Sequence, residues 1–104
     1  HPTDRLLNIR EPIALNLDKV FDTAKRNHVF LEINSSPQRM DLDGMKVKAG
    51  KLAGCQFALS TDGHDVNHLP GYAYGVLSAR RGWLEKKDLL NCWELPKIEK
   101  ALGK

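Results

Sequence analysis

The order of two short apolar runs around one helical segment constrains the fold of this chain more than any other feature. Val29–Ile33 and Cys55–Ser60 have the length and the apolar or β-branched content of buried strands. Residues 43–53, between them, have a helical pattern followed by Gly54, a residue suited to end a helix. A strand–helix–strand connection this short favours parallel strands in one sheet, so we predict an α/β fold. The expected apolar face of the middle helix consists of Met45, Ala49, Leu52 and Ala53.

Another helix is expected before the first strand, over residues 17–27. Asn16 is suited to cap its N-terminus, and Asp18 adds a negative charge to the first turn, where it is favourable. Residues 1–16 have no clear period and are expected to form a loop. One apolar stripe runs along the helix and consists of Leu17, Val20, Phe21 and Ala24.

The C-terminal third of the chain is expected to be helical. Pro70 suits the first turn of a helix that runs to about Arg81, and Gly82 would end it. Residues 86–102 have the pattern of one or two short helices interrupted at Pro96. The apolar face of the helix near Pro70 is expected to contain Leu69, Ala73, Val76 and Leu77.

Length and composition bound the class of protein. The chain has 104 residues, enough for one small domain over positions 1–104. The net charge of +3 is spread thinly, which permits a nucleic-acid partner without predicting one. No apolar stretch approaches the roughly 20 residues that cross a bilayer, so no membrane partner is expected. Cys55 begins an apolar run and is expected to be a buried reduced thiol, which is typical of a cytoplasmic protein.

Polar residues follow the two predicted strands at the end where α/β proteins bind ligands. Asn34 follows the first strand, Asp62 and His64 follow the second, and His1 would follow a strand if one preceded it. Carboxylate and imidazole are common ligands of zinc and manganese, so His1, Asp62 and His64 are candidate metal ligands. The spacing alone favours an Asx-turn at Asp62 beside an exposed His64, and the position at a strand end makes the metal site an equal alternative.

Further charged residues are expected near the same rim. Glu32 lies inside an apolar run, where an unpaired carboxylate is costly. It is either a neighbour of the metal site or the partner of an arginine such as Arg39. Arg5 and Arg39, in loops that would reach this rim, have the guanidinium geometry that suits phosphate, although loop arginines are often only solvated.

Several motifs, taken in order, resemble the C-terminal half of the PHP (polymerase and histidinol phosphatase) domain of bacterial and archaeal family X DNA polymerases. The resemblance covers nearly all of the chain, and a series of motifs in one order is far more specific than an Asp-x-His step alone. The motifs are His1-Pro-Thr-Asp-Arg-Leu-Leu, Arg10-Glu-Pro, Leu31-Glu-Ile-Asn34, Pro37-Gln-Arg-Met-Asp-Leu42, Ser60-Thr-Asp-Gly-His64 and Ala79-Arg-Arg-Gly-Trp-Leu84.

This resemblance implies a distorted barrel of alternating β and α units, with parallel strands, crossover helices and a helical C-terminus. It implies divalent metals, zinc or manganese, at the strand ends, bound in part by His1, Asp62 and His64, with Glu32 and Asn34 close by. The implied activity is that of a phosphoesterase acting on DNA 3′ ends, as a 3′-5′ exonuclease or 3′-phosphatase attached to a polymerase.

The chain also departs from the family pattern. Asp4 and Asn8 stand where the resemblance leads us to expect glycines. The early His-x-His motif and the first barrel strands are absent, so the chain is expected to be a fragment that is weakly active or inactive alone. An exposed sheet edge would favour self-association. The alternatives are a non-catalytic DNA- or protein-interaction module with a vestigial metal site, and a phosphatase of the histidinol-phosphatase type.

Overall fold

β1 (Leu31–Asn34) and β2 (Phe57–Ser60) form a parallel two-stranded sheet in the computed structural model, which describes residues 1–104. Leu31 lies opposite Phe57, and Asn34 lies opposite Ser60. The predicted α/β fold and parallel pairing are therefore confirmed, although both strands begin two residues later than expected. β1 also extends through Asn34, which places this side chain in the strand rather than after it.

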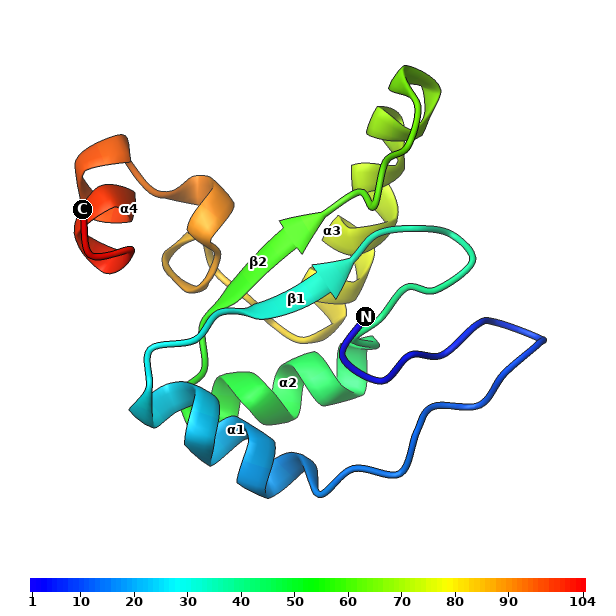
Figure 1. Ribbon diagram of the computed structural model, residues 1–104, viewed down its shortest axis with the longest axis horizontal. Coiled ribbons are helices and arrows are strands. Elements are labelled where there is room, and N and C mark those ends of the chain that lie inside the picture. Colours follow the sequence, from blue (N-terminus) through cyan, green and yellow to red (C-terminus); the bar gives the residue numbers. More distant parts are fainter.

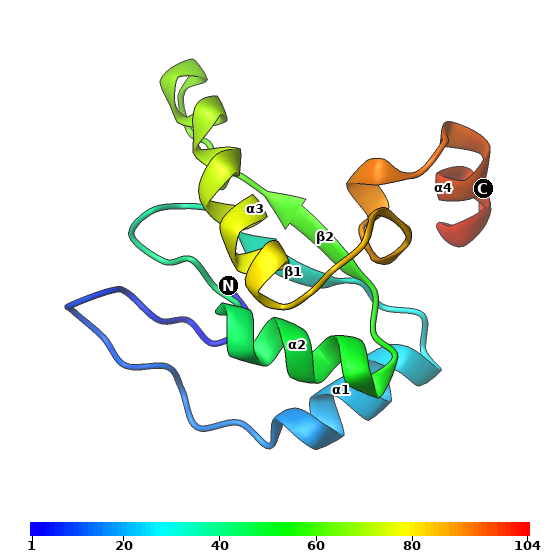
Figure 2. The same ribbon diagram turned by 180° about the vertical axis from the view of Figure 1, so that it is seen from behind.

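Three helices pack side by side against the sheet (Figures 1 and 2). They are α1 (Leu17–Arg26), α2 (Gly44–Ala53) and α3 (Tyr72–Arg81), with α2 between the other two. Side chains alternate along a strand, so the two faces of the sheet differ. Ile33 and Phe57 are fully buried in the core, whereas Glu32 and its neighbour Ser60 lie on the other face and bond to each other. The polar face carries the candidate site.

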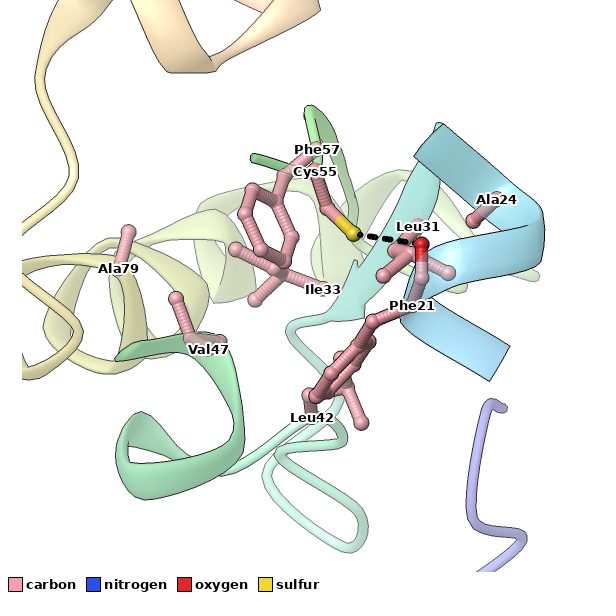
Figure 3. Packing of buried hydrophobic residues seen from close by; sticks show 9 residues of the cluster. All are labelled: Phe21, Ala24, Leu31, Ile33, Leu42, Val47, Cys55, Phe57 and Ala79. Atoms are coloured by element: carbon pink, nitrogen blue, oxygen red, sulfur yellow. Dashed lines mark hydrogen bonds between the residues drawn. The ribbon is translucent and has the colours of Figure 1, made fainter. Parts of the chain in front are cut away.

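The core lies between the sheet and α1 and α2, as Figure 3 shows. The cap and the apolar stripe predicted for α1 are confirmed: the Asn16 side chain accepts the Lys19 amide, and Phe21 is buried. Cys55 is a buried free thiol that donates to the Phe21 carbonyl oxygen at 3.3 Å, and burial raises its pKa. The fully buried apolar side chains are Phe21, Phe57, Ile33, Leu42 and Val47.

The apolar face predicted for α2 is wrong except at Ala53, which packs against the core. Met45 and Leu52 are 86% and 78% exposed, and the residues that face the core are Val47 and Gly50. A Cβ atom on Gly50 would lie 3.0 Å from the Phe57 ring. The helix therefore approaches the sheet through a residue without a side chain, which a search for large apolar residues overlooks.

The apolar face predicted for α3 is wrong for the same reason. Leu69, Val76 and Leu77 are exposed, whereas the small residues Gly75, Ser78 and Ala79 are buried. A Cβ atom on Gly75 would lie 2.0 Å from Ser35 Oγ, so the α3 backbone packs directly on the side chains of Ser35, just after β1, and Leu59 of β2. Pro70 belongs to a separate 3₁₀ helix, Val66–Gly71, that precedes α3.

Short helices complete the chain and cover one edge of the sheet. Two 3₁₀ helices, Lys86–Asp88 and Leu90–Cys92, precede α4 (Leu95–Ala101), whose first turn contains Pro96. The Asn91 side chain accepts the Leu59 amide at 2.8 Å and donates to the Leu59 carbonyl oxygen at 2.9 Å, which occupies the outer edge of β2. No helix has the combined length and hydrophobicity that a bilayer crossing requires.

The close approach of α3 can be tested by adding one methyl group. We expect Gly75→Ala to lower the free energy of unfolding by about 1–3 kcal/mol, because the new Cβ overlaps Ser35 and Leu59. Gly71→Ala is the matched control, since no heavy atom lies within 4 Å of the added Cβ. Urea denaturation of both variants measures the difference, and equal stability would show that α3 can move away from the sheet at no cost.

Candidate functional site

Asn34 connects three distant parts of the chain at the carboxyl end of β1. Its side chain is fully buried, and Nδ2 donates to Asp62 Oδ2 at 3.2 Å and lies 2.9 Å from His1 Nδ1. An amide nitrogen only donates, so His1 Nδ1 is the acceptor in this contact. Asn34 Oδ1 accepts the Ser36 amide at 3.0 Å, which fixes the orientation of the carboxamide.

Two of the three candidate ligands, His1 and Asp62, lie close to each other. His1 Nδ1 is 3.9 Å from Asp62 Oδ2. Nitrogen and oxygen ligands lie about 2.0–2.2 Å from zinc, so two of them in a tetrahedral site are about 3.4 Å apart. The donor types suit one divalent metal, but binding would require the two side chains to approach each other and the Asn34 amide to leave His1 Nδ1.

His64 lies next to Asp62 but does not join its carboxylate. Its Nδ1 is 2.8 Å from the Asp62 carbonyl oxygen, which can only accept, so Nδ1 carries a proton. Its Nε2 is left available to a metal, as is usual for a histidine ligand held by a second hydrogen bond. No group of three or more His, Cys, Asp or Glu side chains in the chain is arranged to hold a metal ion.

Three loop residues have a left-handed backbone, and two of them, Asp4 and Asp62, lie next to the site. Asp62 has a φ of +53°, and Asp4, where the resemblance leads us to expect glycine, also has a φ of +53°. Asn8, at the other such position, has a φ of +62°. Glycine adopts this conformation without steric cost, and Asn and Asp tolerate it better than other residues. The first loop therefore keeps a glycine-type conformation despite the two substitutions.

Glu32 faces the amino end of the chain and not an arginine. Its Oε1 accepts from Ser60 Oγ at 2.6 Å, and its Oε2 pairs with the amino group of His1. The ion pair with Arg39 that the sequence left open is not formed. Glu32 is thus held on the polar face of the sheet by Ser60.

Arg39 lies at the candidate site, whereas Arg5 bonds to the backbone of the loop that carries Arg39. Arg39 Nε is 3.9 Å from Asp62 Oδ2, and its Nη1 donates to Asp4 Oδ1 at 3.2 Å. Arg5 Nε donates to the Arg39 carbonyl oxygen at 2.7 Å, and its Nη2 donates to the Met40 carbonyl oxygen. The guanidinium of Arg5 is therefore occupied by the loop that carries Arg39.

A buried carboxylate that sequence reasoning missed attaches the N-terminal segment to this end of the sheet. Asp41 is fully buried and accepts both the backbone amide and the hydroxyl of Thr3, each at 2.8 Å. The Asp41 backbone pairs with Asn34, so Thr3 is held next to β1. Nothing in the local sequence marks this pair, because its members lie 38 positions apart.

A cavity of about 670 Å³ opens beside Asp62, between the 36–39 loop and the start of α3. It has the size of a small-ligand site and is lined mainly by polar residues. Sequence analysis named three of its residues, Arg39, Asp62 and His64, as candidates. The lining residues are Leu6, Ser36, Pro37, Gln38, Arg39, Thr61, Asp62, His64, Asn67, His68, Pro70, Gly71, Ala73 and Tyr74.

The chain thus has an α/β fold with a polar site at the carboxyl ends of its parallel strands. Comparison with known proteins adds that the chain is similar to the DNA polymerase/3'-5' exonuclease PolX of Bacillus subtilis (strain 168). The two are 32% identical over 102 residues, which is 98% of this chain and 18% of PolX. The chain thus corresponds to a PolX-related region and spans about a fifth of that relative's length. No protein-family model matches the chain.

Removing the hydroxyl group of Thr3 tests the attachment of the N-terminal segment. We expect Thr3→Val to destabilise the fold by about 1.5–3 kcal/mol, because the buried Asp41 carboxylate loses one of its donors. Thr23→Val, at an exposed position on α1, makes the same chemical change without such a contact. Chemical denaturation should separate the two variants, and equal midpoints would rule out this role for Thr3.

Proposed function

We propose that this chain is part of a metal-dependent phosphoesterase that acts on DNA 3′ ends, as a 3′-5′ exonuclease or 3′-phosphatase, in a PolX-like protein. The observation that carries the proposal is the convergence of His1 and Asp62, 3.9 Å apart, beside Arg39. The similarity to a protein named as a polymerase and 3'-5' exonuclease supports the choice of DNA as the substrate.

Each residue of the site has a chemical task in this proposal. Zinc or manganese bound by His1, Asp62 and His64 would supply an activated water and neutralise phosphate charge. Asn34 holds the Asp62 carboxylate in place through the contact described above, and Ser60 holds Glu32 beside it. Arg39 offers a guanidinium with the geometry for phosphate oxygens at the edge of the cavity.

We further propose that the sheet belongs to a distorted barrel of the PHP type. Its strands are parallel, helices cover one face, and the other face carries polar side chains that point toward the site. In such a barrel, additional metal ligands come from other strands. The chain by itself is therefore expected to be a poor catalyst, because it gathers only two donors around one position.

Activity of the natural protein that carries this chain tests the proposal. With manganese or zinc, we expect Asp62→Ala to reduce the release of nucleotides or phosphate from DNA 3′ ends by at least about 100-fold, because a ligand is lost. We expect Asn34→Ala to reduce it by about 10–100-fold. Asp22→Ala removes the same charge from the exposed surface of α1 and should leave the rate unchanged. Full activity in Asp62→Ala would end the proposal.

A non-catalytic DNA- or protein-interaction module is the second candidate. It is favoured by one observation, namely that no three potential ligands are gathered within the chain. The two candidates differ in metal binding by the natural protein. Manganese titration should give saturable binding that Asp62→Ala and His64→Ala each weaken at least about tenfold if the phosphoesterase proposal holds. Binding that neither substitution changes would favour the module.

A further inference from the structure

A second pocket, distinct from the candidate metal site, has a strong excess of positive charge. It has a volume of about 590 Å³ and lies where the C-terminal end of α3 meets the start of α2. We call it the arginine pocket, since Arg5, Arg80 and Arg81 line it together with Gly44 and Asp43. Guanidinium groups in a pocket are suited to bind phosphate.

The negative charge in the arginine pocket is already neutralised. Burial by itself raises the pKa of Asp43, but the hydrogen bonds and charge of Lys46, with the charge of Arg5, outweigh burial and lower it. Asp43 thus stays ionised and paired with Lys46 and Arg5. Arg80 and Arg81 form no ion pair. Their charges remain available to an anion.

The position of the Arg81 side chain depends on the absence of a side chain at Gly44. A Cβ atom on Gly44 would lie 2.4 Å from Arg81 Cβ and 3.3 Å from Arg81 Cδ. The aliphatic part of Arg81 therefore packs directly on the first residue of α2. The favourable effect of positive charge at a helix C-terminus explains the presence of Arg80 and Arg81, but it does not require this contact.

The arginine pocket and the candidate site lie along the same helix. Tyr74 near the start of α3 lines the cavity beside Asp62, and Arg80 near its end lines the arginine pocket. Six residues of helix rise about 9 Å. A separation of this size is within reach of one short DNA strand.

Hydrogen bonds between Arg5 and Arg39 connect the two sites. Its guanidinium donates to the Arg39 carbonyl oxygen at 2.7 Å, and the guanidinium of Arg39 donates to the Arg5 carbonyl oxygen at 3.4 Å. This reciprocal contact fixes the spacing between Arg39 at the candidate site and the arginine pocket. A fixed spacing suits a polymer with regularly placed phosphates.

We propose that Arg80 and Arg81 bind a backbone phosphate of the DNA strand whose 3′ end lies at the candidate site, upstream of that end. This inference rests on the proposed function. Arg5 contributes charge to the arginine pocket, while its donors support the 39–40 loop. The site would hold a strand in register without reading its sequence, because phosphates carry no base information.

The test is binding of single-stranded DNA to the natural protein that carries this chain, by fluorescence anisotropy without divalent metal. For a strand of about ten nucleotides, we expect the double variant Arg80→Ala/Arg81→Ala to bind more weakly. The slope of log affinity against log salt should fall by about 0.7 for each lost phosphate contact. A dinucleotide, too short to reach the arginine pocket, should bind both proteins equally.

Two further variants make the result specific. Lys97→Ala/Lys100→Ala removes the same charge from α4 and should leave the salt slope unchanged. Gly44→Ala keeps every charge but displaces Arg81, so it should weaken binding of the long strand. Thermal unfolding of each variant checks that the fold is retained.

The outcomes separate this inference from the proposed function. An unchanged affinity and salt slope in the Arg80/Arg81 variant would overturn the inference and leave the pocket to an acidic protein partner. An equal loss in the Lys97/Lys100 variant would overturn it too, because the effect would be one of net charge. Loss of 3′-end activity in Asp62→Ala would remain as separate support for the proposed function in either case.

Discussion

The buried carboxamide of Asn34 is the interaction on which the arrangement of the site depends. It is placed by β1, held by the Ser36 amide, and contacts both His1 and Asp62. A carboxamide can make these contacts without carrying charge into a buried position, which would be costly. A carboxylate here would repel Asp62, and an aliphatic residue would leave the polar groups around it unpaired. The neutral polar side chain at the end of β1 thus allows His1 and Asp62 to lie next to each other.

A second constraint is the use of small residues where the helices meet the sheet. α2 contacts the two phenylalanine rings of the core through Gly50, and α3 contacts the side chains of Ser35 and Leu59 through Gly75. Such contacts bring the helix backbone close to the strands and leave little room for adjustment, because any added atom meets a packed neighbour. The loops that carry the site extend from the ends of these elements. Their positions are therefore set by backbone contacts as much as by apolar side chains.

Sequence patterns predicted the elements of the fold better than their orientation. The stripe on α1 and its Asn16 cap were predictable, since large apolar residues recur at helical spacing. The buried faces of α2 and α3 were not, because Gly50 and Gly75 give no apolar signal while exposed residues such as Met45 do. At the site, the position of Asp62 after a parallel strand predicted its approach to His1. The role of Asp41 was hidden, because it depends on a contact with Thr3 that only the folded chain creates.

The carboxamide of Asn91 has a consequence for the way in which this sheet can grow. By saturating both backbone groups of Leu59, one side chain takes the place of a neighbouring strand on the β2 flank. On the other flank, the Asp41 backbone already pairs with Asn34, so only the start of β1 is left to accept another strand. Both flanks of the sheet are therefore partly closed by the chain itself, which limits the backbone groups that a second copy could use.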